Sequence, residues 1–249
     1  MDIIGNGFIA RHLEPLRHRH HGVTVLAAGV PRQGLPPSEL AREADLVRAT
    51  SDRARQRGSL LVFFSTASMY GTPGCRGTED EPIEPSTRYG AHKLDLERVV
   101  RESGAAHLIL RLAYVLGPHG PDFRLLPALI RQLRAGRIRI EQGARRDMVY
   151  VDDYVRVFDA LLDTGVRDQV VNLASGDCVE VGRIVDHLEA KLDIRAERDI
   201  VSGSVSHCPS VAKLNGLLPH LTAATFGEGY HRTAIDRYLR ATAAADLTA

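Results

Sequence analysis

Short apolar runs alternate with amphipathic stretches along the 249 residues, and this alternation constrains the fold more than any other feature. Leu60–Phe64 is continuously apolar, which is typical of a strand buried on both faces of a sheet. Further strands are expected at residues 23–28, 108–112 and 170–173. Because amphipathic stretches separate these runs, the sequence predicts an α/β fold with a mostly parallel sheet between helices.

A glycine-rich turn follows the first expected strand, Asp2–Ile4, and precedes a helix expected from Phe8 to His18. It fits the pattern G-x-G-x-x-G/A, in which the first glycine permits a tight turn and the second lets backbone amides approach a pyrophosphate. The N-terminus of the helix adds free N–H groups and the positive end of its dipole. We therefore expect a dinucleotide to contact Gly5, Asn6, Gly7, Phe8 and Ile9.

Tyr89 and Lys93 lie one turn apart on an expected helix, so they share one face. A nearby cation lowers the pKa of a phenol, which predicts that Tyr89 exchanges a proton near neutral pH. Thr66 follows an apolar strand at the carboxyl edge of the sheet, where its hydroxyl can polarise a reacting oxygen. These three residues form the candidate catalytic set. His92 lies on another face of the same helix and is expected at the surface.

The charge balance argues against several classes of partner. With 32 basic and 31 acidic residues the formal net charge is +1, so no strong field attracts nucleic acid or an anionic membrane. The chain has no apolar run near the roughly 18 residues of a membrane span, and it begins in an expected strand rather than a signal-like segment. We therefore predict a cytoplasmic protein with neither nucleic acid nor a membrane as partner.

The three cysteines, Cys75, Cys178 and Cys208, are far apart and lack the spacing of metal ligands. Their odd number and wide separation predict a reducing compartment, no disulfide and no bound metal. The acidic run Glu79–Glu81 falls in an expected loop, where we expect it to be solvated.

Seven segments resemble, in order, motifs of the extended short-chain dehydrogenase/reductases, and specifically of the nucleotide-sugar epimerase/dehydratase group. They are GNGFIARHL (5–13), LAAGV (26–30), VFFSTASMYG (62–71), TEDEPIEPSTRYGAHK (78–93), LRLAYVLGP (110–118), RRDMVYVDDYVR (145–156) and VVNLASG (170–176). The resemblance implies a doubly wound, mostly parallel Rossmann sheet with a small C-terminal substrate lobe. The core would comprise residues 1–116 and 147–175, and the lobe residues 117–146 and 176–249.

The resemblance also implies roles for individual residues. Tyr89 matches the family's acid/base, Thr66 its Ser/Thr, and Lys93 the lysine that holds the cofactor ribose. Arg146 matches an arginine that grips a nucleotide diphosphate, a task suited to the guanidinium fork. The further positions implied are Ala27, Ala28 and Gly29 for the cofactor and Ser68, Met69 and Tyr114 for the substrate, with Met69 fitting core packing equally well.

The chain departs from the family in its cofactor-binding half. Two strand–helix units are missing after the glycine turn, because Val23–Gly29 resembles the family's fourth strand. The acidic residue that binds the ribose of NAD is missing as well. Arg32 and the basic cluster Arg17–His21 fit a 2′-phosphate, although the cluster also fits a solvated helix end. We predict NADPH or NADH as cofactor, with NADPH slightly favoured.

Ala67 and Ser68 stand where the family's dehydratases have an Asp-Glu pair, which disfavours elimination of water. The resemblance to short members from deoxysugar and antibiotic biosynthesis implies reduction of a dTDP-4-keto-6-deoxyhexose by NAD(P)H. A nucleotide-sugar 4-epimerase and a non-catalytic, family-derived binding protein are the alternatives. A homodimer is expected through residues 40–57 and 89–101, which carry apolar stripes.

Overall fold

The computed structural model describes residues 1–29, 34, 36–71, 75–203 and 205–246. The centre of the protein is a five-stranded sheet in the order β1-β2-β3-β4-β9, in which every neighbouring pair is parallel. The strands are β1 (Asp2–Ile4), β2 (Val23–Leu26), β3 (Leu60–Thr66), β4 (His107–Leu112) and β9 (Gln169–Leu173). The α/β fold expected from the alternating pattern is confirmed.

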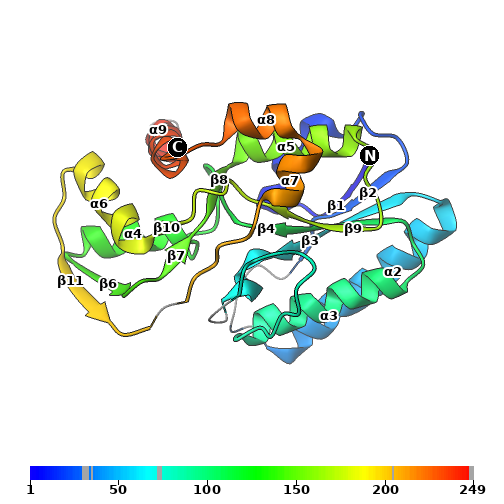
Figure 1. Cartoon of the computed structure of the whole chain (residues 1–249), viewed down its shortest axis with the longest axis horizontal. Coiled ribbons are helices and arrows are strands. Elements are labelled where there is room, and N and C mark those ends of the chain that lie inside the picture. Colours follow the sequence, from blue (N-terminus) through cyan, green and yellow to red (C-terminus); the bar gives the residue numbers. More distant parts are fainter. Residues whose placement is uncertain (30–33, 35, 72–74, 204, 247–249) are drawn as a thin grey trace.

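Helices cover both faces of this sheet (Figure 1). Those nearest the site are α1 (Phe8–Leu13), α2 (Pro37–Arg57), α3 (Arg88–Glu102) and α5 (Val151–Asp163). α2 and α3 pack against each other under one face, whereas α1 and α5 pack together on the other. Alternate residues of β3 point to opposite layers, with Val62 and Phe64 in the core beside α1 and α5, and Leu61 and Phe63 in the core above α2 and α3.

β1 lies at one edge of the sheet, and no described strand pairs with its outer side. A complete doubly wound sheet continues past its first strand in the opposite direction. Here the strand order follows the chain order, and only the 3₁₀ helix η1 (Glu14–Leu16) and a turn separate α1 from β2. The prediction that two strand–helix units are missing is confirmed, and the sheet ends at β1.

Capping residues fix the helices that carry the site. Thr87 is the N-cap of α3, and its Oγ1 accepts a hydrogen bond from the N–H of Gly90 at 3.0 Å. α2 ends, as predicted, at Gly58, whose φ of 62° is in the left-handed region. α1 is shorter than predicted, because it gives way to η1 at Pro15, which has no N–H for a helical hydrogen bond.

The remaining elements extend the sheet domain at one end and cover it from above (Figure 1). They are η2 (Ala67–Tyr70), β5 (Tyr114–Leu116), α4 (Leu125–Arg134), β6 (Arg137–Glu141), β7 (Arg145–Arg146), β8 (Met148–Tyr150), β10 (Val179–Glu180), α6 (Val181–Leu192), β11 (Glu197–Val201), α7 (Ala212–Leu217), α8 (Pro219–Thr225) and α9 (Tyr230–Asp246). Three two-stranded sheets pair β5 with β8, β6 with β11, and β7 with β10. α4, α6, β6 and β11 gather at one end of the molecule, while α7 packs on β9 and α8 on α5. Within the described ranges, every helix is too short or too polar to cross a membrane.

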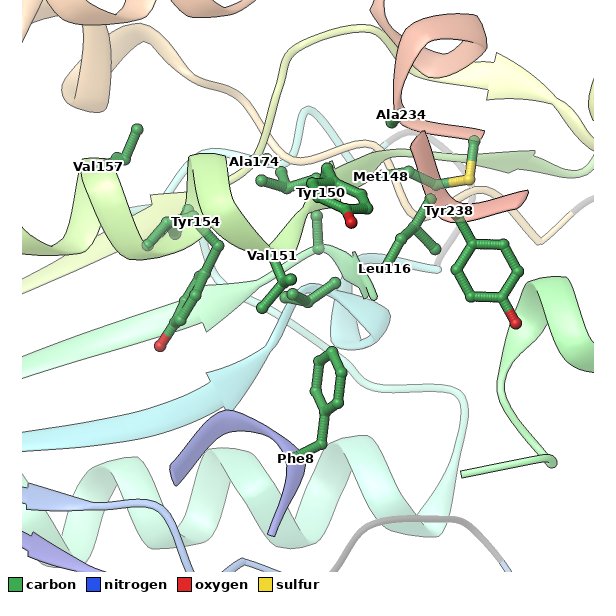
Figure 2. Close-up of a cluster of buried hydrophobic side chains, with 14 of the residues drawn as sticks. Phe8, Leu116, Met148, Tyr150, Val151, Tyr154, Val157, Ala174, Ala234 and Tyr238 are labelled. Carbon is green, nitrogen blue, oxygen red and sulfur yellow. The ribbon is translucent and has the colours of Figure 1, made fainter. Parts of the chain in front are cut away.

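Aromatic side chains tie the helices of the upper layer to the sheet (Figure 2). The ring of Tyr154 on α5 lies 6.2 Å from that of Phe64 on β3 and 6.0 Å from that of Phe158. Phe8, the first residue of α1, is buried in the same core. Burying a side chain of this size stabilises a fold by about 1.5–3 kcal/mol, so this core holds the glycine turn firmly against the sheet.

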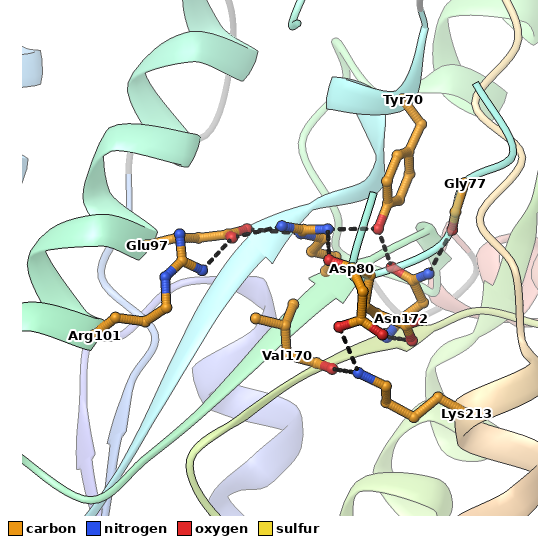
Figure 3. A network of polar contacts seen from close by, with 10 residues as sticks. Tyr70, Gly77, Asp80, Glu97, Arg101, Val170, Asn172 and Lys213 are labelled. Atoms are coloured by element: carbon orange, nitrogen blue, oxygen red, sulfur yellow. Dashed lines mark hydrogen bonds and ion pairs between the residues drawn. The ribbon is translucent and has the colours of Figure 1, made fainter. Parts of the chain in front are cut away.

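A buried polar network links α3 to β4 and β9 (Figure 3). Arg111 donates from Nε and Nη2 to the two carboxylate oxygens of Glu97, at 2.9 and 2.8 Å. Its Nη1 donates to the Tyr70 hydroxyl at 2.7 Å, and that hydroxyl donates to Asn172 Oδ1 at 2.8 Å. Glu79 is buried rather than solvated, because its carboxylate accepts the N–H of Asn172 at 2.9 Å. The prediction of a solvated Glu79 is therefore wrong.

Cys178 and Cys208 form a disulfide, with 5.5 Å between their Cα atoms. The chain after β11 returns beside β7, where His207 forms a bridge with Arg146, and Cys178 directly precedes β10, which pairs with β7. This return brings together two cysteines that are 30 residues apart. The prediction of no disulfide is wrong, and the cysteine argument for a reducing compartment fails with it.

Candidate functional site

Two cavities open at the carboxyl ends of the central strands and meet at Tyr89. One cavity, of about 760 Å³, is bordered by the glycine turn, the end of β2 and one face of α2, and is named the cofactor cavity after the contacts predicted above. The other, of about 480 Å³, is bordered by the segment after β3, by β5 and by the start of α4, and is named the substrate cavity for the same reason. The residues common to both linings are Ile9, Ser65, Tyr89, Leu112 and Arg124. A group held against Tyr89 would therefore face both cavities.

Most of the residues predicted to contact the cofactor line the cofactor cavity. They are Asn6, Gly7, Phe8, Ile9, Ala27, Ala28, Gly29 and Lys93. Gly5 is outside the lining and has a structural task instead. Its φ is +126°, and a Cβ there would lie 2.5 Å from the carbonyl oxygen of Ala27, so glycine lets the end of β1 approach the segment after β2.

Lys93 is buried in the wall of the cofactor cavity. Its Nζ donates to Glu43 Oε1 on α2 at 3.1 Å and lies 4.4 Å from the centre of the Phe63 ring. The other carboxylate oxygen of Glu43 lies 2.9 Å from His92 Nε2. The prediction that His92 is at the surface is wrong, because the helix α2 covers that face of α3.

The electrostatics around Tyr89 differ from the expectation. Burial raises the pKa of Tyr89 above its usual value, and the Glu43 carboxylate raises it further. The Arg124 guanidinium acts in the opposite direction. Burial also lowers the pKa of Lys93, which Glu43 opposes. The phenol therefore has a raised pKa rather than the lowered pKa that the sequence predicted, mainly because it is buried and also because the Glu43 carboxylate lies nearby.

Thr66 ends β3 and lies, with Ser68, in the wall of the substrate cavity. Its Oγ1 accepts the N–H of Ser68 at 3.1 Å and lies 2.9 Å from the Ser68 hydroxyl. These contacts fix the Thr66 side chain as the cap of η2. Two hydroxyl groups thus border the cavity that Tyr89 also borders, which suits hydrogen bonding to a polar ligand.

The other predicted substrate residues divide into two groups. Tyr114 lines the substrate cavity, and its hydroxyl lies 3.0 Å from His207 Nδ1. Met69 is fully buried, and Arg146 lies outside the lining, with its guanidinium carbon 5.9 Å from the centre of the Tyr114 ring. Burial lowers the pKa of His207 to about 4, so this wall contributes a neutral imidazole near neutral pH.

Comparison with known proteins shows the family of this chain. The profile of the NAD dependent epimerase/dehydratase family matches residues 6–174, more than half of the chain. The chain belongs to this family. The match covers the glycine turn from Asn6 onward and all three candidate catalytic residues.

The curated proteins that match this chain include epimerases and a reductase. A UDP-glucose 4-epimerase of Streptomyces lividans is 33% identical over 49% of this chain and 38% of its own length. A dTDP-4-dehydro-6-deoxyglucose reductase of Escherichia coli is 23% identical over 55% of this chain and 46% of its own. The chain thus spans less than half the length of the first curated relatives that it matches.

Solved structures share the fold of this family member. MoeE5 in complex with UDP-glucose and NAD has a TM-score of 0.79 and 21% identity, over 98% of this chain and 99% of its own. A UDP-galactose 4-epimerase has a TM-score of 0.75 and 23% identity, over 91% and 78% of the two chains. At these identities the likeness concerns the fold alone.

Three residues that line the two cavities were not predicted from the sequence: Glu43, Arg124 and His207. Glu43 had a detectable signal, because it precedes Val47 by one turn in the buried stripe of α2. A carboxylate at that spacing must meet a partner inside the protein. Arg124 and His207 had no such signal in the sequence, since each lies in an irregular segment that only the tertiary fold brings to the cavity.

The basic cluster near the end of α1 has other partners than a cofactor. Arg17 pairs with Glu14, and Arg19 and His20 pair with Asp159 on α5. None of these residues lines the cofactor cavity within the described part of the chain. The other basis for favouring NADPH, Arg32, lies outside the described residues.

Proposed function

We propose that this family member reduces the keto group of a nucleotide-linked 4-keto-6-deoxyhexose, with dTDP as the nucleotide, at the expense of NADPH or NADH. The observation that carries the proposal is the position of Tyr89 in the common wall of the two cavities. A phenol placed there reaches a carbonyl oxygen while the carbonyl carbon faces the cofactor. Tyr89, Lys93 and Thr66 are the proposed catalytic set.

In the proposed reaction each residue has one task. When bound, the cofactor supplies a hydride to the carbonyl carbon. Tyr89 donates its phenolic proton to the carbonyl oxygen as negative charge develops there. Thr66 and Ser68, whose hydroxyls border the substrate cavity, orient that oxygen. Lys93 binds the cofactor ribose, and its charge favours the phenolate left after transfer.

The missing strands support reduction over epimerisation. An epimerase must retain its cofactor through oxidation and re-reduction, which favours an enclosed adenosine pocket. In this chain β1 is the edge strand, so that side of the cofactor has no strand to cover it among the described residues. An open site suits a cofactor that enters reduced and leaves oxidised.

The substrate cavity also argues against dehydration. Elimination of water needs a second acid or base beside the tyrosine. Among the described residues that line the substrate cavity there is no carboxylate, and Ala67 and Ser68 occupy the segment directly after Thr66. This composition supports reduction or epimerisation at a single carbon.

A nucleotide-sugar 4-epimerase is the second candidate. Several relatives carry that name, including the Streptomyces lividans protein that is 33% identical over the matched segment. The same three residues serve that reaction, because an epimerase oxidises and re-reduces one carbon. The two candidates differ in whether the cofactor is consumed.

Incubation with a dTDP-4-keto-6-deoxyhexose and NADPH or NADH tests the proposal. We expect stoichiometric loss of reduced nicotinamide and formation of the dTDP-deoxyhexose. Tyr89→Phe should lower turnover by about 10²–10⁴-fold while cofactor affinity is kept, since only the transferred proton is lost. Interconversion of UDP-glucose and UDP-galactose without added cofactor would instead establish the epimerase. If neither reaction occurs, the non-catalytic binding protein is the remaining hypothesis.

A further inference from the structure

The ammonium group of Lys93 already has a partner that the catalytic set does not explain. Glu43 Oε1 accepts from Lys93 Nζ at 3.1 Å, and Glu43 Oε2 lies 2.9 Å from His92 Nε2. Glu43 and Lys93 are only 4% and 2% exposed. Because desolvation offsets most of the Coulombic attraction of a buried ion pair, stability alone does not account for it.

Both members of this pair border the cofactor cavity. Gly29 makes room for them, since a Cβ at that position would lie 2.8 Å from Glu43 Oε1 and 3.5 Å from Lys93 Nζ. A carboxylate has about four lone-pair sites. Lys93 and His92 each occupy one, which leaves acceptor capacity on both oxygens of Glu43.

We propose that Glu43 is a positioning residue that holds Lys93 in place and accepts hydrogen bonds from the ribose hydroxyls that Lys93 contacts in the bound cofactor. A vicinal diol offers two donors to a carboxylate and two acceptor oxygens to an ammonium, so the pair is complementary to it. This inference rests on the proposed function, because it assumes that a nicotinamide cofactor occupies the cavity.

Glu43 also contributes to the pKa of Tyr89. The charged and titratable groups that face Tyr89 and Lys93 are Glu43 from α2, His92 and Glu97 from α3, Arg124 before α4, and Tyr114 from β5. Burial and Glu43 raise the pKa of Tyr89, and Arg124 lowers it. Removal of the Glu43 charge is therefore expected to lower the pKa of Tyr89.

The test compares Glu43→Gln with Asp45→Asn, the same chemical change at an exposed position of α2 outside the cavity lining. Fluorescence titration with NADH and NADPH should show about tenfold weaker binding to Glu43→Gln, the usual loss for one charge-assisted hydrogen bond. Binding of ADP, which lacks the nicotinamide ribose, should be unchanged. The high-pH fall of kcat should move to lower pH in Glu43→Gln and stay in place in Asp45→Asn.

Glu43→Asp keeps the charge but shortens the side chain, so it should keep the wild-type pH profile while it weakens cofactor binding. If Glu43→Gln does not fold, cofactor binding by Glu43→Asp still tests the proposal. Gly29→Ala, which pushes a methyl group against the pair, should resemble Glu43→Asp. Unchanged cofactor affinity and an unmoved pH profile in the folded Glu43 variants overturn this inference alone. A wild-type chain that binds neither cofactor overturns the proposed function and this inference together.

Discussion

Tyr89 lies between two side chains with opposite effects on its proton. Glu43 stabilises the neutral phenol and Arg124 the phenolate, while burial disfavours charge on the phenol altogether. Arg124 is held in place from two sides, because its Nη1 donates to the Val115 carbonyl at 3.1 Å and its guanidinium lies 4.5 Å from the centre of the Phe8 ring. The pKa of Tyr89 therefore depends on side chains that lie outside its own helix.

Removal of the Arg124 charge should shift the pH profile. As proton donor, Tyr89 must be protonated, so the reduction rate falls as pH rises through its pKa. Arg124→Met removes the cation that lowers this pKa, and the fall should move to higher pH, opposite to the shift in Glu43→Gln. Arg131→Met, on the exposed side of α4, is the matched control and should leave the profile in place. A shift to lower pH in Arg124→Met would contradict the prediction.

The connections between strands show how the trimmed sheet differs from a regular one. The steps from β1 to β2 and from β2 to β3 run in the same direction across a parallel sheet. Their helices, α1 and α2, nevertheless lie on opposite faces. The two connections must therefore have opposite hand, although such connections are right-handed in about 98% of cases. The missing strand–helix units explain the opposite hand. Helix α1 lies on the face of the sheet that it has in a complete fold, but the strand that would follow it there is missing, so the chain continues into β2 on the other side of β1.

The buried ion pair between Glu97 of α3 and Arg111 of β4 should contribute strongly to the free energy of unfolding. Glu97→Gln leaves the buried Arg111 guanidinium without its counter-ion, which typically costs about 3–5 kcal/mol of unfolding free energy. Glu102→Gln, on the exposed side of the same helix, should change stability by less than about 0.5 kcal/mol. Denaturant unfolding of the three proteins measures both values, and equal stability of the two variants would contradict the role of this ion pair.

The disulfide should link redox conditions to stability. Opening the bond between Cys178 and Cys208 frees a 30-residue loop, which is expected to cost about 2–4 kcal/mol. A thermal melt should shift to lower temperature on addition of reductant, and Cys178→Ser should melt at the lower temperature with or without it. Cys75→Ser should respond to reductant like the wild type, because Cys75 is free.

The sequence was informative wherever local pattern decides structure. The apolar run of β3, the glycine turn and a helix that carries Tyr89 and Lys93 were all predicted, and the structure has Thr66 at the end of β3 and the other two residues on α3. Partners brought together from distant segments were not predictable. The pairing of Glu43 with Lys93 and the meeting of Cys178 with Cys208 depend on helix packing and on a returning chain, which leave no periodic signal.

At the scale of the whole molecule, the layer formed by α2 and α3 is the proposed dimer surface. Leu40 of α2 and Leu94 of α3 are half-buried and belong to neither of the two buried cores. Light scattering should give twice the chain mass of 27.3 kDa. Leu94→Glu should halve that value, since a charge there opposes burial against a second copy. A wild-type chain that elutes as a monomer would refute the dimer.

The free edge of β1 has a consequence for the range of reductants. On the proposed function, the residues that line the cofactor cavity, from the glycine turn to Lys93, would contact the nicotinamide half of a dinucleotide and its phosphates, whereas no described strand lies beyond β1 to contact the adenine. A half-sized donor such as reduced nicotinamide mononucleotide would keep most of the contacts that this chain offers.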